Sequence, residues 1–443
     1  MNVAVIKTKA EQTLSQQFEA NRAALPGAKA VSALRAKAFG TFAGLGLPHR
    51  RVEEWKYTDL RQALKDVAPL SVRDDTNVAT RDLDAALGPL AGLDAWRVVF
   101  VNGHFRKELS RLDNVRGLDI TSLAEALSAS PDSVGESLAR STAPDSESII
   151  ALNTALMTDG AVIRVAANAK LAKPLLVVHA NAGKSARLVV SRHLLSAGAG
   201  AEGLVIEAHV ALAGAVAGQT NTVTEVSVAE GASLTHVQVA NGAGATHLAS
   251  WMIAIGAKAN YRAFQLTADV ALARNQLFVT FKGENAKLDA SGAFLGRDRD
   301  HIDTTMVVDH AVPQCESREL FKGVLDGRAR GVFQGKVIVR PDAQKTDGKQ
   351  MAQALMLSED AEFDSKPELE IHADDVVCGH GATVAEIDPA LMFYLANRGI
   401  PRDDARAMLI ESFVGDAMEK VENEPLRDAL KAIARGWLGR HAS

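Results

Sequence analysis

The stretch LVIEAHVALAGAVAGQTNTVTEVSVAEGASLTHVQVA, residues 204–240, decides the fold. It contains short runs rich in Val, Ile and Leu, which small residues and glycines separate. The same pattern extends from about residue 161 to about residue 339. Short strands at such even spacing predict an all-β unit.

The turns of this region recur with a loose period. The pairs Gly231-Ala232, Gly256-Ala257 and Asn285-Ala286 lie about 25–30 residues apart, which fits β-helix coils with small residues at the corners. Only 5% of the residues are aromatic, which suits an interior of stacked aliphatic side chains. We therefore expect a mainly β protein with a β-helix core, and a β-sandwich is the structural alternative.

Helical patterns flank the β region. Leu14, Phe18 and Leu25 have helical spacing, and residues 96–105 resemble a strand. Near the C-terminus, Asp388 and Pro389 form an N-cap followed by proline at the first helical position. One apolar helix face is expected beyond it: Ala405, Leu409, Phe413, Ala417 and Val421. Another is expected after Glu424-Pro425: Leu426, Leu430, Ile433 and Trp437.

Three domains follow from these patterns. We expect an N-terminal helical and mixed domain over residues 1–148 and a β-helix core over 149–385. A C-terminal helical domain over 386–443 would cap the core or dock a partner. The Ser/Asp/Pro-rich stretch 128–148 marks the first boundary.

Composition excludes several classes of protein. A net charge of −5 over 443 residues argues against a nucleic-acid binder, and 47% hydrophobic residues exclude global disorder. Two cysteines exclude a disulfide scaffold and indicate a reducing compartment. The N-terminus has no signal-peptide core, and no run approaches the ~18 apolar residues of a membrane span. We expect a cytoplasmic protein that binds neither nucleic acid nor membrane.

The sequence GAGAEG, Gly198 to Gly203, matches the G-x-G-x-x-G pattern of dinucleotide-binding loops. Such a loop needs a strand before it, a helix after it and an acid about 20 residues on. Glu225 is near that distance, but the segments after the loop resemble strands. A glycine-rich β-helix corner is therefore the favoured interpretation. The alternative function is a nucleotide- or flavin-binding oxidoreductase acting through this loop.

The segment PELEIHADDVVCGHGAT, residues 367–383, carries the most chemistry. In an extended strand its even positions would share one face, and Cys378 and His380 would project together. A thiolate beside an imidazole suits zinc or iron, or else forms an activated thiol–imidazole pair. A solvated face with an incidental cysteine is the structural alternative. Two ligands do not close a metal site, so a partner chain or a small ligand would supply the rest. The even positions are Glu368, Glu370, His372, Asp374, Cys378 and His380.

Other polar residues fit structural roles. A second cluster occurs in HIDTTMVVDHAVPQCES, residues 301–317, where satisfied polar groups at coil turns are the favoured interpretation. It contains His301, Asp303, Asp309, His310 and Cys315. His179, His209 and His236 lie singly in apolar strands, and we interpret them as core or surface residues.

At this point the sequence resembles the SufB/SufD family of iron–sulfur cluster assembly proteins. The resemblance rests on FKGVLDGRARGVFQG (321–335), ADDVVCGHGAT (373–383) and FYLANRGI (393–400), and in the N-terminal part on RRVEEWKYTDL (50–60) and VFVNGHF (99–105). It covers nearly the whole chain. Gly381 follows His380 where SufB members usually have Glu, and only two cysteines are present, so the pattern is SufD-like.

The resemblance implies a right-handed parallel β-helix between two helical domains. It implies pairing with a SufB paralogue and docking of a SufC ATPase on the C-terminal helices, at positions that include Tyr394, Arg398 and Leu409. His380, and less certainly Cys378, would bind a transient iron–sulfur cluster where the chain meets SufB.

We therefore expect a non-catalytic scaffold subunit with no cofactor bound by the isolated chain. A homodimer of the isolated chain is a further expectation, because the same β-helix edge could serve both pairings. A sugar-processing β-helix enzyme is disfavoured, since no line of Asp or Arg residues marks one face.

Overall fold

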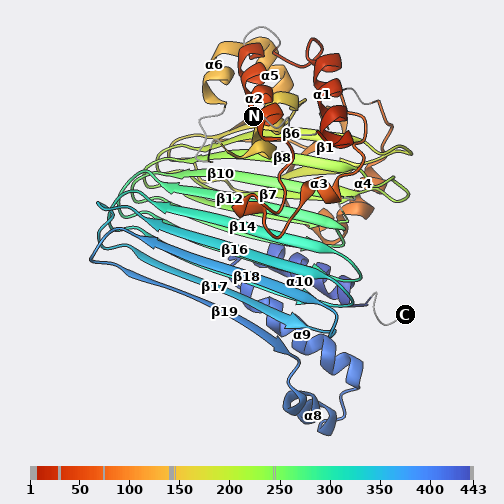
Figure 1. Cartoon of the computed structure of the whole chain (residues 1–443), viewed down its shortest axis with the longest axis vertical. Coiled ribbons are helices and arrows are strands. Elements are labelled where there is room, and N and C mark those ends of the chain that lie inside the picture. The colour runs from red at the N-terminus through yellow and green to blue at the C-terminus, as the bar shows by residue number, and fades with distance from the viewer. Residues whose placement is uncertain are drawn as a thin grey trace, which may run out of the picture.

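The computed structural model describes residues 7–27, 31–72, 75–138, 144, 146–242, 244 and 246–439. Its centre is a β-solenoid, with helices before and after it along the chain (Figure 1). The mainly β architecture with flanking helices is the one predicted from the sequence.

The N-terminal part combines short helices with three strands. Its elements are α1 (Lys9–Asn21), α2 (Ser32–Leu45), η1 (Glu53–Trp55), α3 (Leu60–Ala63), α4 (Thr80–Leu87), η2 (Gly88–Gly92), β1 (Trp96–Val101), β2 (His104–Phe105), η3 (Lys107–Leu109), β3 (Leu118–Ser122), α5 (Leu123–Ala129), α6 (Pro131–Ser137) and α7 (Ser148–Leu156).

Strands of the solenoid then follow one another, and helices end the chain. The strands are β4 (Ala161–Val165), β5 (Leu175–Asn181), β6 (Leu188–Ala197), β7 (Glu202–Ala211), β8 (Gln219–Val228), β9 (Ser233–Asn241), β10 (Thr246–Ile255), β11 (Asn260–Ala268), β12 (Leu272–Phe281), β13 (Lys287–Gly296), β14 (His301–His310), β15 (Glu316–Leu325), β16 (Arg330–Val339), β17 (Asp347–Met356), β18 (Glu362–Ile371) and β19 (Val377–Glu386). The final helices are α8 (Pro389–Asn397), α9 (Arg402–Met418) and α10 (Glu424–Gly439).

Consecutive solenoid strands belong to different sheets. One sheet has ten strands in the order β19-β17-β15-β13-β11-β9-β7-β5-β1-β2, and the other has nine in the order β18-β16-β14-β12-β10-β8-β6-β4-β3. Neighbouring strands pair in parallel from β4 and β5 onward. This is β-helix topology, and it excludes the sandwich alternative, whose sheets are antiparallel.

The small-residue corners stack as their period predicted. The Gly231 N–H donates to the Ala257 carbonyl at 2.9 Å, and the Lys258 N–H donates to the Glu284 carbonyl at 2.9 Å. Ala232 and Ala286 of the predicted turn pairs are fully buried. Small residues suit these corners for two reasons: Ala232 and Ala286 are enclosed between coils, and Gly231 has a positive φ of 68°.

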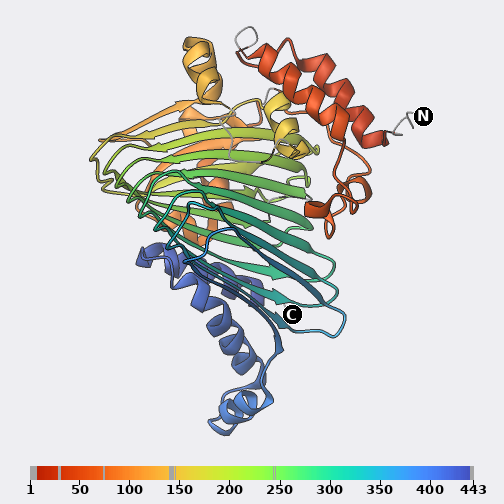
Figure 2. The same ribbon diagram turned by 60° about the vertical axis from the view of Figure 1, so that its left-hand side comes forward.

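Aliphatic side chains fill most of the lumen between the two sheets. The core there includes Val177, Val205, Leu234, Ile253, Val279, Leu288, Val308 and Val337. The outer faces are covered by helices on different sides (Figure 2). α9 packs on β13 and β15, and α10 on β11, whereas α7 packs on β6 and β8 and contacts α2.

All three N-terminal strands belong to the sheets of the solenoid, with β2 paired antiparallel to β1 at the end of the ten-stranded sheet. β1 pairs in parallel with β5, and β3 pairs antiparallel with β4. The strand-like pattern at residues 96–105 is thereby confirmed as β1 and β2. The domain boundary at residue 148 stays a prediction, and residues 139–143 and 145 of the proposed boundary stretch lie outside the described part of the chain.

The apolar face expected on the helix after residue 401 is partly wrong. Ala405, Ala417 and Val421 are buried, but Leu409 and Phe413 are only half-buried, and Ile410 and Val414 take the inner positions instead. A strict four-residue repeat drifts around a helix of 3.6 residues per turn, so it cannot stay on one face. The expected start of α8, with Asp388 as N-cap and Pro389 at the first helical position, and the inner face of α10 are confirmed.

A buried ion pair fastens the segment around Trp55 to the outer face of the nine-stranded sheet. Arg274 pairs with Asp303, and both side chains are completely buried. The Trp55 ring lies 3.8 Å from the Arg274 guanidinium, which also donates to the Glu54 carbonyl at 2.6 Å. Thr58 donates to Asp303. The polar segment with two aromatics noted in the sequence is therefore an anchor.

We expect Arg274→Ala to lower the free energy of unfolding by about 3–5 kcal/mol, because it leaves the Asp303 charge buried without its partner. Denaturant unfolding of the purified variant measures this loss. Arg81→Ala is the matched control, since the Arg81 side chain is 90% exposed and pairs with Asp82 at the surface. The control should stay within about 0.5 kcal/mol of the wild type. Equal losses in both variants would contradict the anchor.

Candidate functional site

The solenoid is open at its C-terminal end. β18 and β19 are the last strands of their sheets, so one edge of each has no neighbour within the described residues. Apolar side chains are exposed there, with Val377 62% and Val384 59% accessible. An exposed strand edge with apolar neighbours is a surface prepared for pairing with another chain.

Cys378 and His380 lie on alternate positions of β19. They are in register with Gly348 and Gln350 of β17, which are buried. Both side chains therefore belong to the lumen face of the last coil, as the alternation predicted. Cys378 is half-buried against the lumen core, and His380 is exposed.

The expectation that Glu368 and Glu370 share this face is wrong. The chain turns at residues 372–376, which contain His372 and Asp374, so the two glutamates lie on β18 in the other sheet. Each pairs with a lysine, Glu368 with Lys366 at 3.2 Å and Glu370 with Lys336 at 2.6 Å. Neither glycine nor proline occurs in this turn to mark it. The alternation of strand faces expected from the sequence was therefore wrongly continued across the turn.

A polar column runs from His380 into the lumen. His380, Gln350 and Glu319 occupy the same register position on β19, β17 and β15. Burial raises the pKa of Glu319 to about 8, so this carboxyl stays protonated at neutral pH. The end of the lumen thus offers an imidazole, an amide and a neutral acid to whatever meets it.

The Cys378 thiol is not activated in the isolated chain. Burial raises its pKa, a backbone hydrogen bond with Gly348 opposes this, and the carboxylates of Asp347 and Glu319 raise it further. A raised pKa keeps the Cys378 thiol protonated at neutral pH, which disfavours the activated thiol–imidazole alternative. Among the described residues, no group of three metal-ligating side chains gathers here. By themselves, Cys378 and His380 are too few to close a metal site.

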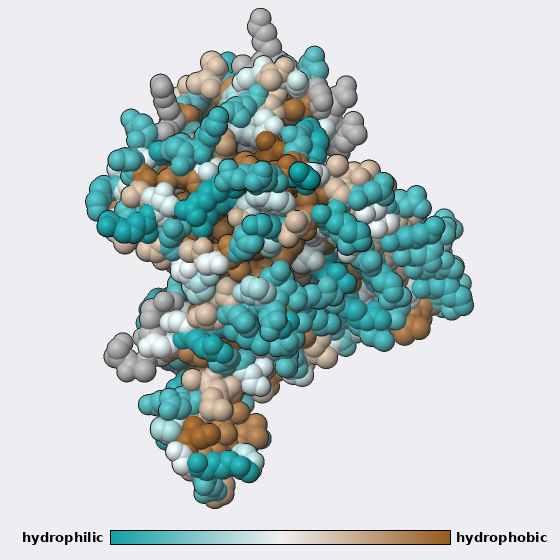
Figure 3. Space-filling model, turned by 180° about the vertical axis from the view of Figure 1, so that it is seen from behind, coloured by the Kyte–Doolittle hydropathy of each residue, from teal (hydrophilic) through white to brown (hydrophobic). Residues whose placement is uncertain are grey.

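The predicted docking residues lie on the two helices after β19. No residue of α8 is buried, and its Phe393 and Tyr394 are 69% and 52% exposed. The Arg398 guanidinium lies 4.6 Å from the centre of the Tyr394 ring. Leu409, on α9, is half-buried. Figure 3 shows hydrophobic residues gathered on the projecting lobe that α8 forms.

A groove of about 860 Å³ runs beside α8. It is bounded by the end of β17, the end of β19 and the start of α9, and Met356, Met392 and Arg406 are among its lining residues. The exposed apolar helix and this groove together form a surface suited to a protein partner.

The glycine-rich loop does not bind a dinucleotide in the expected way. Residues 198–201 connect β6 directly to β7, and no helix follows. A Cβ at Gly198 would lie 2.6 Å from the Ala167 nitrogen, so glycine is required by the close stacking of coils. The oxidoreductase interpretation of Gly198–Gly203 is therefore wrong, and the β-helix corner is confirmed.

The second polar cluster is divided between the two faces of its sheet. His301 and Asp303 contact Thr58 on the outer face, and Asp309 pairs there with Arg340 at 2.8 Å. His310 is buried beside the Phe281 ring, at 4.5 Å between centroids, and Cys315 belongs to the lumen core. The contacts fit the structural interpretation, but the histidines and aspartates lie within β14 and not at a coil turn, and His310 Nδ1 has no hydrogen-bond partner in the described part of the chain.

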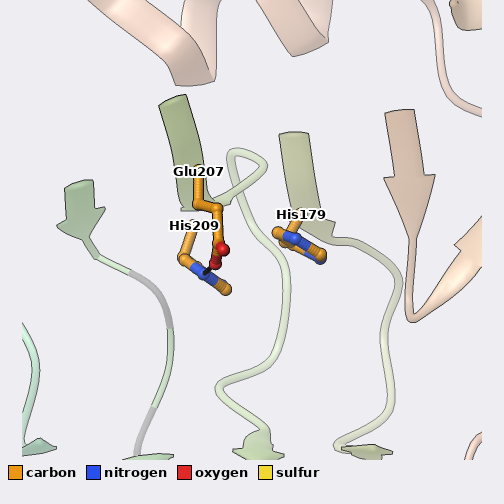
Figure 4. A group of neighbouring side chains, drawn as sticks. All are labelled: His179, Glu207 and His209. Atoms are coloured by element: carbon orange, nitrogen blue, oxygen red, sulfur yellow. Dashed lines mark ion pairs between the residues drawn. The ribbon is translucent and has the colours of Figure 1, made fainter. Parts of the chain in front are cut away.

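Sequence reasoning missed one group inside the lumen. The structure brings together His179, Glu207 and His209, which had been taken as unrelated residues (Figure 4). Burial opposes ionisation of Glu207, but the imidazoles of His209 and His236 outweigh it and hold its pKa well below its usual range. Burial lowers the pKa of His179 well below its usual value. A 30-residue separation between two histidines, close to the coil period, was the available signal.

Comparison with known proteins shows the class. The family model "SufBD protein N-terminal region" matches residues 8–177, and "SUF system FeS cluster assembly, SufBD core domain" matches residues 178–413. The chain therefore belongs to the SufBD family of the SUF system for iron–sulfur cluster assembly.

Its relatives include SufD proteins. The chain is 32% identical over 392 residues to the iron–sulfur cluster assembly protein SufD of Escherichia coli, which covers 87% of this chain and 88% of that protein. It is 30% identical over 410 residues to a SufBD family protein of Synechocystis, covering 87% and 86% respectively. None of the helices in the described ranges is long and apolar enough to cross a membrane.

The buried acid gives a prediction for pH. Because the folded-state pKa of Glu319 is about 8 against an ordinary 4.5, the folded chain holds a proton that the unfolded chain has lost. Stability should therefore fall as pH rises through this window, by roughly 1.4 kcal/mol per unit, and Glu319→Gln should remove that fall.

Urea unfolding of wild type and variant between about pH 5 and pH 8 tests this prediction. Glu316→Gln, on the same strand but paired with Lys287 at the surface, is the control and should follow the wild type. Parallel curves for wild type and Glu319→Gln would show that the acid is ionised throughout.

Proposed function

We propose that the chain is a non-catalytic scaffold subunit of a SufBCD-type complex, in which it pairs with a SufB paralogue and docks a SufC ATPase. The observation that carries the proposal is the open end of the solenoid, where an unpaired strand edge presents Cys378 and His380. Family membership and the SufD relatives support the same assignment.

The partner would extend the solenoid. The outer edge of β19 carries backbone donors and acceptors that a strand of another chain can satisfy, and the exposed Val377 and Val384 add apolar contact. A SufB paralogue has the same type of core, so its own last coil is the natural complement. The isolated chain could use the same edge to form a homodimer.

The cargo would be a nascent iron–sulfur cluster, held only while it is built. His380 is exposed and offers an imidazole, and Cys378 offers sulfur once its proton leaves. Because the two side chains are an incomplete set, ligands from SufB would complete the site. The isolated chain therefore has no resident cofactor in this proposal, and the complex works in the cytoplasm.

ATPase docking would use α8 and the groove beside it. Phe393 and Tyr394 provide exposed apolar surface, and Arg398 adds a positive charge beside the Tyr394 ring. α9 connects this lobe to the ten-stranded sheet, where Lys322 pairs with Asp416 at 2.6 Å. Movement of the docked ATPase would thus be transmitted to the strands that end at the cluster site.

We expect His380→Ala to leave complex formation intact and to lower the iron and acid-labile sulfide of the co-purified complex by more than half. The reason is loss of one cluster ligand without loss of the strand edge. The measurement is co-expression with SufB and SufC, purification, and metal and sulfide analysis. His372→Ala is the matched control, because His372 lies in the turn between β18 and β19 and contacts Glu370.

Equal iron and sulfide contents in the wild-type and His380→Ala complexes would show that the role of His380 is structural. The assignment to the complex would still stand. Loss of loading in the His372 control as well would show a general effect on this end of the solenoid. Failure of the wild-type chain to form any complex would refute the scaffold assignment.

Charged substitutions on α8 should weaken ATPase binding. We expect Phe393→Asp and Tyr394→Asp each to reduce affinity for SufC more than tenfold, since a buried aromatic anchor contributes on the order of 2 kcal/mol. Calorimetry with purified SufC measures this change. Val216→Asp is the control, because Val216 is 45% exposed and lies far along the chain.

Leu409→Asp should also lower the melting temperature, because Leu409 is half-buried. If both α8 variants bound SufC with unchanged affinity, SufC would have to dock elsewhere on the chain.

A further inference from the structure

The lumen group lies far from the open end. His179 of β5 and His209 of β7 are register partners, and Glu207 precedes His209 by two residues on the same face. Five strands of the sheet stand between β7 and β19. At the usual spacing of neighbouring strands, the group is roughly 29 Å from Cys378 and His380. It is therefore a separate site.

Its donor atoms converge. One nitrogen from each histidine and one Glu207 oxygen lie within 4.8 Å of one another. The two imidazole rings stack with centroids 4.4 Å apart, and the Glu207 Oε2 to His209 Nε2 distance is 3.6 Å (Figure 4). That distance is too long for a good hydrogen bond but suits two ligands of one ion.

Two of these ligand nitrogens lack a hydrogen bond. His179 Nε2 and His209 Nε2 are both buried, and neither finds a hydrogen-bond partner in the described part of the chain. Buried polar atoms are almost always satisfied, and an unsatisfied one in a native structure calls for a ligand or another explanation. A metal ion at the convergence point would satisfy both nitrogens.

The remaining neighbours act as supports. His236 Nε2 donates to Glu207 Oε1 at 2.8 Å while the Tyr261 hydroxyl is 2.9 Å from its Nδ1. Thr224 also donates to Oε1 at 2.8 Å. Oε1 is thus fully engaged and Oε2 is left to bind an ion. Such outer hydrogen bonds orient ligands in metal sites.

The two other lumen histidines nearby are not ligands. His193 accepts the Ala161 N–H at its Nδ1, so its neutral ring carries the proton on Nε2 and has no second lone pair. His247 contacts Thr220 through Nδ1 and Gln238 through Nε2, both at 2.9 Å. The ligand set is therefore limited to two imidazoles and one carboxylate.

We propose that His179, Glu207 and His209 bind a divalent first-row transition-metal ion inside the solenoid, independently of the site at its open end. Two imidazoles with one carboxylate suit zinc(II) and iron(II), whereas magnesium and calcium prefer all-oxygen sites. The partly exposed His179 lines a crevice of about 10 Å³, with Gly103 and Thr222, that has room for one ion or water. The ion would enter there and keep an open coordination position.

The test uses the full chain, made without a polyhistidine tag and carrying Cys378→Ala and His380→Ala to remove the other site. After chelation and desalting, the protein is loaded with zinc(II) in air, with iron(II) under nitrogen, or with cobalt(II), and desalted again. We expect about one ion per chain for zinc or iron, visible cobalt(II) absorption without a thiolate band, and a metal-dependent rise in melting temperature.

His179→Gln should lower retention at least tenfold, and Glu207→Gln should do the same. His247→Gln is the matched control, since it changes a lumen histidine that is not a ligand, and it should retain the ion. Circular dichroism confirms that each variant is folded. If a variant does not fold, the proposal is tested by whether the metal ion raises the melting temperature of the starting chain.

Retention of neither zinc nor iron by the starting chain would overturn the proposal. Equal retention in folded His179→Gln would overturn it as well, because the ion would then bind elsewhere. The outcome is independent of the SufB-pairing proposal, since the starting chain already lacks both cluster ligands.

Discussion

The in-register parallel ladder is the constraint on which the rest of this structure depends. Each inner coil satisfies its backbone through the coils before and after it, so the strands can be short while the sheets are long. This geometry also fixes what each side chain does. Along each strand, residues point alternately into the lumen and to the outer face, and helices cover the outer faces.

Much of the fold could be predicted from local sequence because the ladder repeats locally. Turn pairs such as Gly231-Ala232 and Asn285-Ala286 mark corners that stack. What could not be predicted depends on long-range contact. The anchoring of Trp55 by Arg274 joins residues more than 200 positions apart, and no periodicity within either segment indicates it. The inner face of α9 was misjudged at Leu409 for a different reason: a four-residue repeat drifts around a helix of 3.6 residues per turn, and Ile410 takes the inner position.

The candidate sites also differ in how far local sequence alone could predict them. Cys378 and His380 share one strand, so alternation alone predicted their common face. Glu319 joins them only through the registers of β15, β17 and β19, which the sequence does not state. His179 and His209 likewise meet because two coils align. If the register of the coils had been assigned first, each of these residues could have been assigned correctly to its neighbours.

The two ends of the solenoid are unlike. At the N-terminal end the sheets finish in the short antiparallel strands β2 and β3, whose direction opposes the ladder. At the other end β18 and β19 finish in parallel with it. In the proposed pairing, two such bodies joined end to end would cover each other's β18 and β19 edges. Only the short antiparallel strands would remain at the outer ends, so the pairing would not continue through the same edge into a fibre.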